Sequence, residues 1–175
     1  DPSMWTLLKG LWRSEIGSFR EGPELESLAP NFTLETVDGK RKIELKSLIG
    51  KKPVVLVFGN YTCGPYRVTY GSVEDVRRRF AEEVEFVSVY VREAHPTDGW
   101  RMTFNDRNGV ALPQPTTKSE RVKVAAECSS VLKMTMPLLV DDLDDKVGNL
   151  YSGMPSRLYL IDRDGKVAYK SGRGP

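Results

Sequence analysis

One cysteine of this chain stands in a context suited to thiol chemistry. The apolar, β-branched run over residues 54–58 predicts a buried central strand that stops at Gly59. Cys63 follows four residues later, and the polar, periodic stretch 66–83 predicts a helix. The thiol therefore belongs at the amino end of a helix, where unpaired N–H groups and the helix dipole favour a thiolate. A dithiol motif would carry its second cysteine at position 66, which is Tyr66, so we expect a one-cysteine site.

Composition describes an ordinary soluble globular protein of one domain. The chain has 175 residues, of which 39% are hydrophobic and 29% charged. A net charge of +2 gives no case for nucleic acid as a partner. Two cysteines make no disulfide framework, and His95 is the single histidine, so we expect no Cys/His metal site. No apolar run reaches membrane-spanning length, and a cytoplasmic location is favoured although the sequence leaves the compartment open.

Residues 1–24 are expected to form an N-terminal amphipathic helix and a linker. Gly22-Pro23 ends the helix. Its apolar residues recur at helical spacing and comprise Trp5, Leu8, Leu11, Trp12, Ile16 and Phe19. We expect this stripe to pack on the domain that follows. The alternative is a helix that binds a membrane surface or a partner.

Residues 25–175 are expected to form one α/β domain. The alternation of Phe32 and Leu34 before Asp38-Gly39 predicts a hairpin, and Asp164-Gly165 predicts a second one. Strands predicted over 54–59, 84–91 and 137–140 alternate with helices over 66–83, 117–133 and 144–150, a pattern typical of a parallel sheet core. Cys128 lies within the second of these helices and is interpreted as a packed core residue.

The stretch from Arg92 to Pro115 is long and is predicted to be irregular, because it carries several prolines and glycines. A loop of this length inside a compact domain is usually functional. It contains His95, which is the usual acid–base partner of a thiol near neutral pH.

Two phrases resemble thioredoxin-like proteins. The opening A-P-N-F-T-L, followed by L-I-G-K-K-P-V-V-L-V-F, resembles peroxiredoxins and thioredoxin-like thiol reductases, in which it forms an edge hairpin before the central strand. The phrase around Pro155, G-M-P-S-R-L-Y-L-I-D-R-D-G-K-V, resembles thiol reductases in which that proline is cis beside the thiol. The resemblance implies a thioredoxin-like fold, with a central mixed sheet flanked by helices and an edge β-hairpin. It also implies a cis Met154–Pro155 bond and a C-terminal helix beyond Pro175.

Three further motifs are similar to the signature of the iodothyronine deiodinases. They are F-G-N-Y-T-C-G-P around Cys63, E-A-H-P-T-D-G-W around His95, and G-R-G-P at the end of the chain. The resemblance implies reductive removal of iodine from an aromatic ring, with Cys63 as the nucleophile. The catalytic set that it implies is Cys63, His95 and Thr62, and the substrate-binding set is Arg173, Glu93, Trp100 and Pro155. Arg173 would hold a substrate carboxylate.

The same resemblance implies partners. It points to an iodinated or otherwise halogenated aromatic substrate, no bound cofactor, and an external thiol reductant or thioredoxin-type partner that resets the cysteine. A homodimer is an expectation at family level.

The chain departs from the family pattern at four positions. Cys63 stands where vertebrate members place selenocysteine, and sulfur is the weaker nucleophile. Pro115 stands for a second histidine, Ser156 for an acidic residue, and Tyr61 for a cysteine. These changes leave open whether the substrate is a thyroid hormone or another halogenated ring.

Two other classes of function remain open. One is a peroxiredoxin-like thiol peroxidase or a general single-cysteine thiol reductase, although the usual P-x-x-x-T-x-x-C motif is absent because positions 59 and 60 are Gly and Asn. The other is a non-catalytic binding module that uses the 92–115 loop as its interface. It predicts that Cys63 alkylates no faster than a free thiol.

Overall fold

The computed structural model describes residues 4–5, 8 and 21–174. The amphipathic helix predicted within residues 1–24 falls largely outside these ranges, and the boundary at residue 24 stays a prediction. Over the ranges that are described, we find no helix with both the length and the hydropathy needed to cross a bilayer.

The centre of the molecule is a mixed sheet of seven strands in the order β2-β1-β5-β4-β3-β6-β7. Pairing is parallel between β3 and β4 and between β4 and β5, and antiparallel elsewhere. The predicted mixed sheet with an edge hairpin is therefore confirmed. The strands are β1 (Thr33–Thr36), β2 (Lys42–Glu44), β3 (Val54–Gly59), β4 (Glu85–Tyr90), β5 (Leu138–Val140), β6 (Arg157–Ile161) and β7 (Val167–Lys170).

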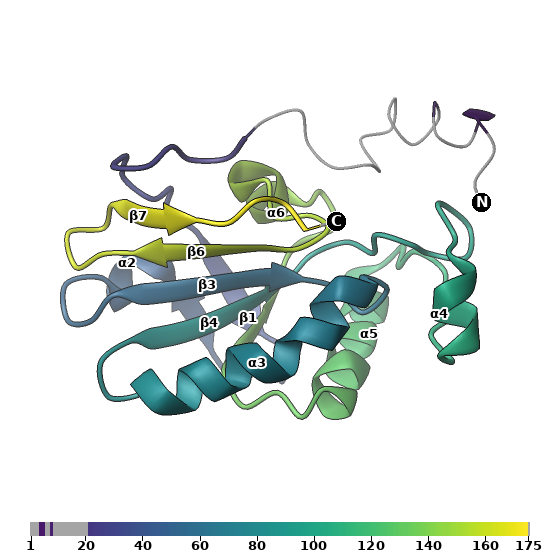
Figure 1. Ribbon diagram of the computed structural model, residues 1–175, viewed down its shortest axis with the longest axis horizontal. Coiled ribbons are helices and arrows are strands. Elements are labelled where there is room, and N and C mark those ends of the chain that lie inside the picture. The colour runs from purple at the N-terminus through teal and green to yellow at the C-terminus, as the bar shows by residue number, and fades with distance from the viewer. Residues whose placement is uncertain (1–3, 6–7, 9–20, 175) are drawn as a thin grey trace.

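Helices cover both faces of this sheet. They are α2 (Leu45–Leu48), α3 (Gly64–Phe80), α4 (Thr103–Arg107), α5 (Lys118–Val131) and α6 (Lys146–Tyr151). Helix α3 crosses in front of β3 and β4, whereas α6 lies behind β6 (Figure 1). The chain steps in one direction along the sheet from β3 to β4 to β5, so right-handed crossovers place α3 and α5 on the same face. Contacts from Glu74 of α3 to Thr135, just after α5, agree with this placement.

Side chains of β3 alternate between these two layers. Phe58 stacks on Tyr151 of α6 with ring centroids 5.3 Å apart. On the other face Gly59 lies against the ring of Tyr66, whose hydroxyl lies 3.2 Å from the Ser88 hydroxyl of β4. Every residue of β3 is buried, as predicted for a central strand. This packing fixes the point where β3 ends and α3 begins.

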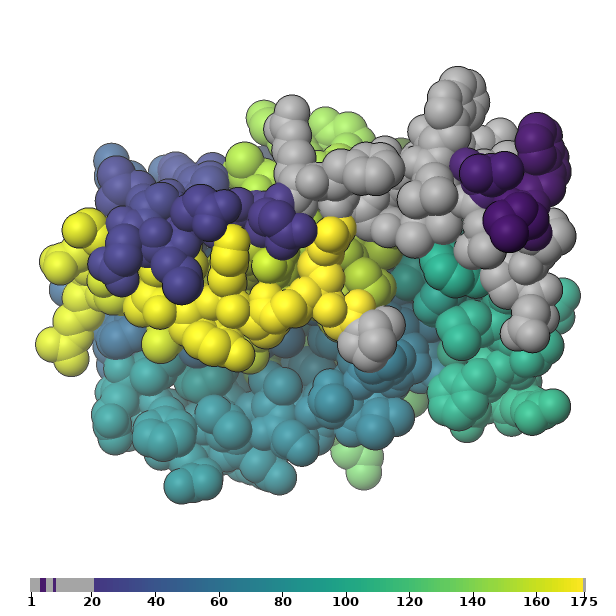
Figure 2. Space-filling model, turned by 45° about the horizontal axis from the view of Figure 1, so that its top comes forward, coloured from purple at the N-terminus to yellow at the C-terminus, as the bar shows by residue number. Residues whose placement is uncertain are grey.

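The predicted turns are confirmed. Asp38-Gly39 connects β1 to β2 and Asp164-Gly165 connects β6 to β7, with both glycines at positive φ. The Met154–Pro155 bond is cis, as the resemblance implied. The prediction of an irregular 92–115 stretch was incomplete, because this stretch contains the short helix α4. Helix α4 stands beyond the end of β3 and forms the green-teal lobe at one end of the space-filling view (Figures 1 and 2).

Replacing Gly59 with alanine should destabilise the fold. The added Cβ would fall 2.2 Å from the Tyr66 ring, which is itself buried. Overpacking of this kind costs about 1–3 kcal/mol, measurable by urea unfolding. Gly71→Ala in α3 is the control, because apart from its own stretch of helix nothing lies within 4 Å of its Cβ, and alanine favours a helix. Equal stability of Gly59→Ala and the parent chain would contradict the packing at the end of β3.

Candidate active site

Cys63 lies between the end of β3 and the start of α3. It is the residue that precedes α3, and Pro65 occupies the first turn of that helix, where a missing N–H costs nothing. The backbone N–H of Cys63 donates to the carbonyl of Asn60 at 3.3 Å and so closes a tight turn after β3. The side chain is fully buried. The predicted placement at the helix amino end is confirmed, but solvent does not reach the sulfur.

Burial raises the pKa of the Cys63 thiol above its ordinary value. The Tyr66 N–H and the Ser156 hydroxyl both bond to the sulfur and lower this pKa, as does the charge of Arg67, but their combined effect is smaller than that of desolvation. The negative charge of Glu93 adds to the rise. The prediction of a favoured thiolate was therefore wrong for the resting protein, because it considered the helix terminus without the cost of burying a charge.

Glu93 lies beneath the loop that carries Cys63. Its side chain is 2% exposed, and one carboxylate oxygen accepts from the Thr62 N–H at 2.8 Å while the other accepts from the Tyr90 hydroxyl. Its backbone N–H and C=O both bond to the side chain of Gln114, at 3.0 and 3.1 Å. Burial raises the pKa of Glu93. These contacts position the loop that carries Cys63, and the expected role of Glu93 in binding a substrate stays a prediction.

His95 is held at both its backbone and its ring. Its N–H donates to the Thr62 hydroxyl at 3.0 Å, and Nδ1 lies 3.0 Å from the carbonyl oxygen of Trp100. A carbonyl can only accept, so Nδ1 carries the proton and Nε2 is unprotonated in the neutral ring. The Trp100 ring also meets the imidazole edge-on at 5.5 Å. Burial, with a smaller effect of Arg67, lowers the pKa of His95.

Asn60 connects the thiol loop to its two neighbours. Its Nδ2 donates to the carbonyl of Pro155 at 2.9 Å, and its Oδ1 accepts from the Thr62 hydroxyl and the Ala94 N–H, both at 3.1 Å. The structure thus brings Cys63, Thr62, Glu93, His95, Trp100 and Pro155 into one hydrogen-bonded assembly. The Thr62 hydroxyl therefore donates to Asn60 and accepts from the backbone N–H of His95.

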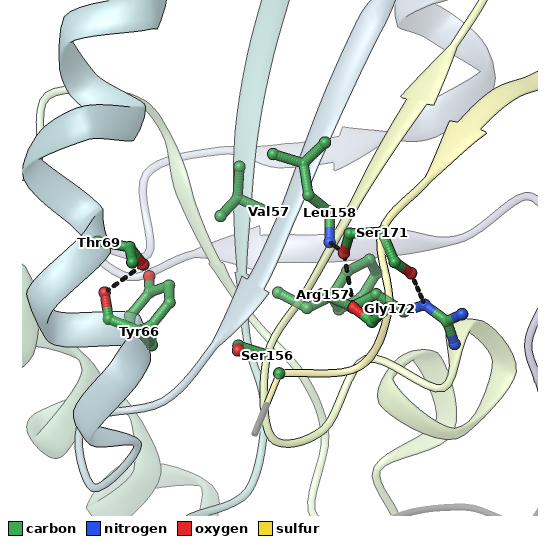
Figure 3. Close-up of a pocket in the computed structure, with 10 residues that line it drawn as sticks. Val57, Tyr66, Thr69, Ser156, Arg157, Leu158, Ser171 and Gly172 are labelled. Atoms are coloured by element: carbon green, nitrogen blue, oxygen red, sulfur yellow. Dashed lines mark hydrogen bonds between the residues drawn. The ribbon is translucent and has the colours of Figure 1, made fainter.

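A cavity of about 160 Å³ lies beside this assembly. Tyr66 and Thr69 of α3 form one wall, and the opposite wall comes from β6 and the segment after β7 (Figure 3). Ser156 lines the cavity, and hydrogen bonding from its hydroxyl lowers the pKa of the Cys63 thiol. The Gly174 N–H donates to the Ser156 carbonyl at 2.8 Å and closes the C-terminal side.

Arg173 lies at the margin of the site. Its guanidinium pairs with Glu21 at 3.3 Å and is not among the groups that line the cavity beside Ser156. The expected role in binding a carboxylate therefore stays a prediction. A second cavity of about 130 Å³ lies on the other side of Glu93, between Trp100 and Gln114. Within the described part of the chain, no three His, Cys, Asp or Glu side chains gather as a metal site would require.

Sequence reasoning missed several supporting residues. Asn60 and Arg67 lie three residues before and four residues after Cys63, so their nearness in sequence was a usable signal. Asn105 and Gln114 carried no such signal. They reach the thiol loop through contacts of long sequence separation, from Asn105 to Thr62 and from Gln114 to Glu93.

His95 should titrate below its ordinary pKa of 6.5, because burial disfavours the imidazolium. The chain has one histidine, so a single imidazole resonance followed by NMR against pH reports this group without ambiguity. We expect the midpoint below 6.5 and a return toward it in Trp100→Gly, which opens the site to water. A midpoint above 6.5 in the parent chain would contradict the described environment.

Comparison with known proteins shows the family to which this chain belongs. The family model described as iodothyronine deiodinase matches residues 3–175. Thyroxine 5-deiodinase of Gallus gallus is 31% identical over 98% of this chain and 66% of its own length. That of Sparus aurata is 29% identical over 98% of this chain and 64% of its own length. The chain therefore spans slightly less than two thirds of these relatives.

Solved structures agree with the fold. A putative protein disulfide isomerase from Bacteroides thetaiotaomicron has a TM-score of 0.63 at 21% identity, over 85% of this chain and 78% of its own. A putative thiol:disulfide interchange protein from Chlorobium tepidum has a TM-score of 0.61 at 20% identity, over 87% and 88%. These likenesses confirm the thioredoxin-like fold. With the cysteine at the amino end of α3, the family match over nearly the whole sequence shows that this chain belongs to the iodothyronine deiodinase family.

Proposed function

We propose that this chain is the catalytic region of a thiol-dependent oxidoreductase that removes iodine reductively from an iodinated aromatic ring. The observation that carries the proposal is the junction of β3 and α3. There a buried cysteine, a histidine loop and a ring-sized cavity meet in a member of the iodothyronine deiodinase family.

The proposed reaction begins with attack of the Cys63 sulfur on iodine. An S–I bond forms as the C–I bond breaks, and the ring carbon takes the bonding electrons and a proton. The sulfur is oxidised and the carbon is reduced. His95 is bonded to the thiol loop at Thr62 and its Nε2 is unprotonated, so we infer that this nitrogen takes the thiol proton and returns it to the ring carbon.

An external thiol completes the cycle. It attacks the oxidised sulfur, iodide leaves, and a mixed disulfide forms that a second thiol resolves. The net change converts Ar–I and two thiols into Ar–H, iodide, a proton and one disulfide. An external thiol is needed because position 66 is a buried tyrosine and Cys128 is enclosed in α5.

The size of the cavity favours one ring at a time. An apolar cavity of about 150 Å³ holds one benzene molecule, and the cavity beside Ser156 is about 160 Å³. Val57 and Leu158 supply apolar wall (Figure 3). The hydroxyls of Thr69 and Ser171 donate to the carbonyls of Pro65 and Gly172, so toward a phenol they are suited only to accept its O–H. We infer that a single iodinated phenol ring enters this space, and that any second ring of a larger substrate stays outside it.

A peroxidase function is less well supported. Peroxide reduction at a thiol needs a hydroxyl that polarises the peroxide, and the Thr62 hydroxyl is already bonded to Asn60 and to the His95 N–H. If the protein consumed peroxide faster than it consumed an iodophenol, the peroxidase function would be favoured.

Iodide release from mono-iodinated phenols in dithiothreitol tests the reaction. Cys63→Ser should abolish release, and His95→Ala should lower it by about 10²–10⁴-fold, the usual contribution of an acid–base group. Cys128→Ser is the matched control, because that thiol is buried within α5, and it should retain activity. Release that persists in Cys63→Ser would refute the proposed nucleophile.

Filling the cavity should weaken substrate binding. Thr69→Phe places a ring in the cavity beside Ser156, so we expect KM for a single-ring substrate to rise about tenfold or more, a loss of about 1.4 kcal/mol. Val68→Phe is the control on the same turn of α3, since Val68 is 75% exposed and does not line the cavity. Equal KM values for the two variants would place the ring elsewhere.

A further inference from the structure

Arg67 folds back over the loop that carries the thiol. It lies one helical turn after Cys63, and its backbone N–H donates to the Cys63 carbonyl at 3.2 Å. Its half-buried side chain returns toward the start of α3, where Nη1 donates to the Tyr61 carbonyl. The guanidinium also lies over the Tyr61 ring, 5.9 Å from its centroid, in a cation–π contact. The positive charge is therefore tied to the loop two residues before the sulfur.

Asn105 of α4 holds the other side of this guanidinium. Its Oδ1 accepts from Nη2 of Arg67 at 2.9 Å, and its Nδ2 donates to the Thr62 carbonyl at 2.7 Å. Asn105 is 2% exposed, so both bonds are shielded from water. A closed set of contacts results, in which Arg67 and Asn105 together bind the carbonyls of the two residues that precede Cys63.

Helix α4 also contacts the first turn of α3 directly. A Cβ built on Gly64 would lie 3.2 Å from the ring of Phe104, so this ring covers the residue that follows Cys63. The lobe that contains α4 (Figure 2) thus touches the thiol loop through Asn105 and through Phe104.

The groups around the Cys63 sulfur have opposing effects on its ionisation. The Tyr66 N–H, the Ser156 hydroxyl and Arg67 favour the anion, whereas burial and Glu93 oppose it. Arg67 also lowers the pKa of His95, so one charge favours both a thiolate and a neutral imidazole. A neutral imidazole is the form that can accept the thiol proton.

We propose that Arg67, held in place by Asn105, is the positioned charge that stabilises the Cys63 thiolate when the buried sulfur ionises for attack. Helix α4 thereby sets the reactivity of the thiol, although it contributes no atom to the reaction. The inference rests on the proposed function, in that Cys63 is taken to be the reacting group.

The rate of Cys63 alkylation by iodoacetamide, measured against pH by mass spectrometry of the Cys63 peptide, tests the proposal. Arg67→Met removes the charge and keeps the aliphatic stem, so we expect the alkylation midpoint to rise by about one pH unit, with alkylation about tenfold slower at neutral pH. Arg67→Lys should restore part of the shift, because it keeps the charge but loses the two-pronged contact. Arg78→Met is the matched control, since that side chain is exposed on α3 and pairs with Asp75.

Asn105→Ala is the second variant. It keeps Arg67 but removes its anchor, and we expect a shift in the same direction and of smaller size. The proposal is overturned if folded Arg67→Met has the parent midpoint. If Arg67→Met does not fold, an unshifted midpoint in Asn105→Ala overturns it instead.

Alkylation needs no iodinated substrate, so the two proposals can fail separately. A parent chain that releases no iodide refutes the proposed function. The midpoints of Arg67→Met and Asn105→Ala still decide whether the charge acts on the thiol.

Discussion

A buried carboxylate supports the loop that carries Cys63. Glu93 follows β4 and receives the Thr62 N–H and the Tyr90 hydroxyl, and that same hydroxyl accepts the Tyr61 N–H at 3.1 Å. Removing the carboxylate would leave buried donors without partners, which is the costly way to lose a hydrogen bond. The carboxylate thus holds the loop at Thr62, the residue before Cys63, while the backbone of the same residue binds the side chain of Gln114.

Short stretches of sequence predicted most of the strands, helices and turns. The β-branched run of β3 and the glycine turns at positions 39 and 165 each act over a few residues. The resemblance supplied the cis bond before Pro155 and the identity of the thiol. Elements set by local chemistry were therefore predictable without knowledge of the fold.

The site was less predictable because its properties arise from distant residues. The helix amino end suggested an ionised thiol, but full burial of Cys63 is a property of the packed molecule. Helix α4 has only five residues, too few for periodicity to predict, and its importance comes from Asn105, which bonds to a residue 43 positions earlier. The bond from the Thr62 N–H to Glu93 likewise joins residues 31 positions apart, and no local pattern predicts it.

The burial of Cys63 has a second consequence in the proposed cycle. A sulfur that has taken iodine is an electrophile, and in open water it would hydrolyse to a sulfenic acid before a thiol arrived. Because Cys63 is fully buried, its sulfur is shielded from that side reaction. The cavity beside Ser156 obliges the deiodinated ring to depart before the reductant enters, so the cycle divides into two half-reactions with the oxidised enzyme stored between them. In the proposed cycle, the burial that raises the pKa of the resting Cys63 thiol also protects its oxidised form from water.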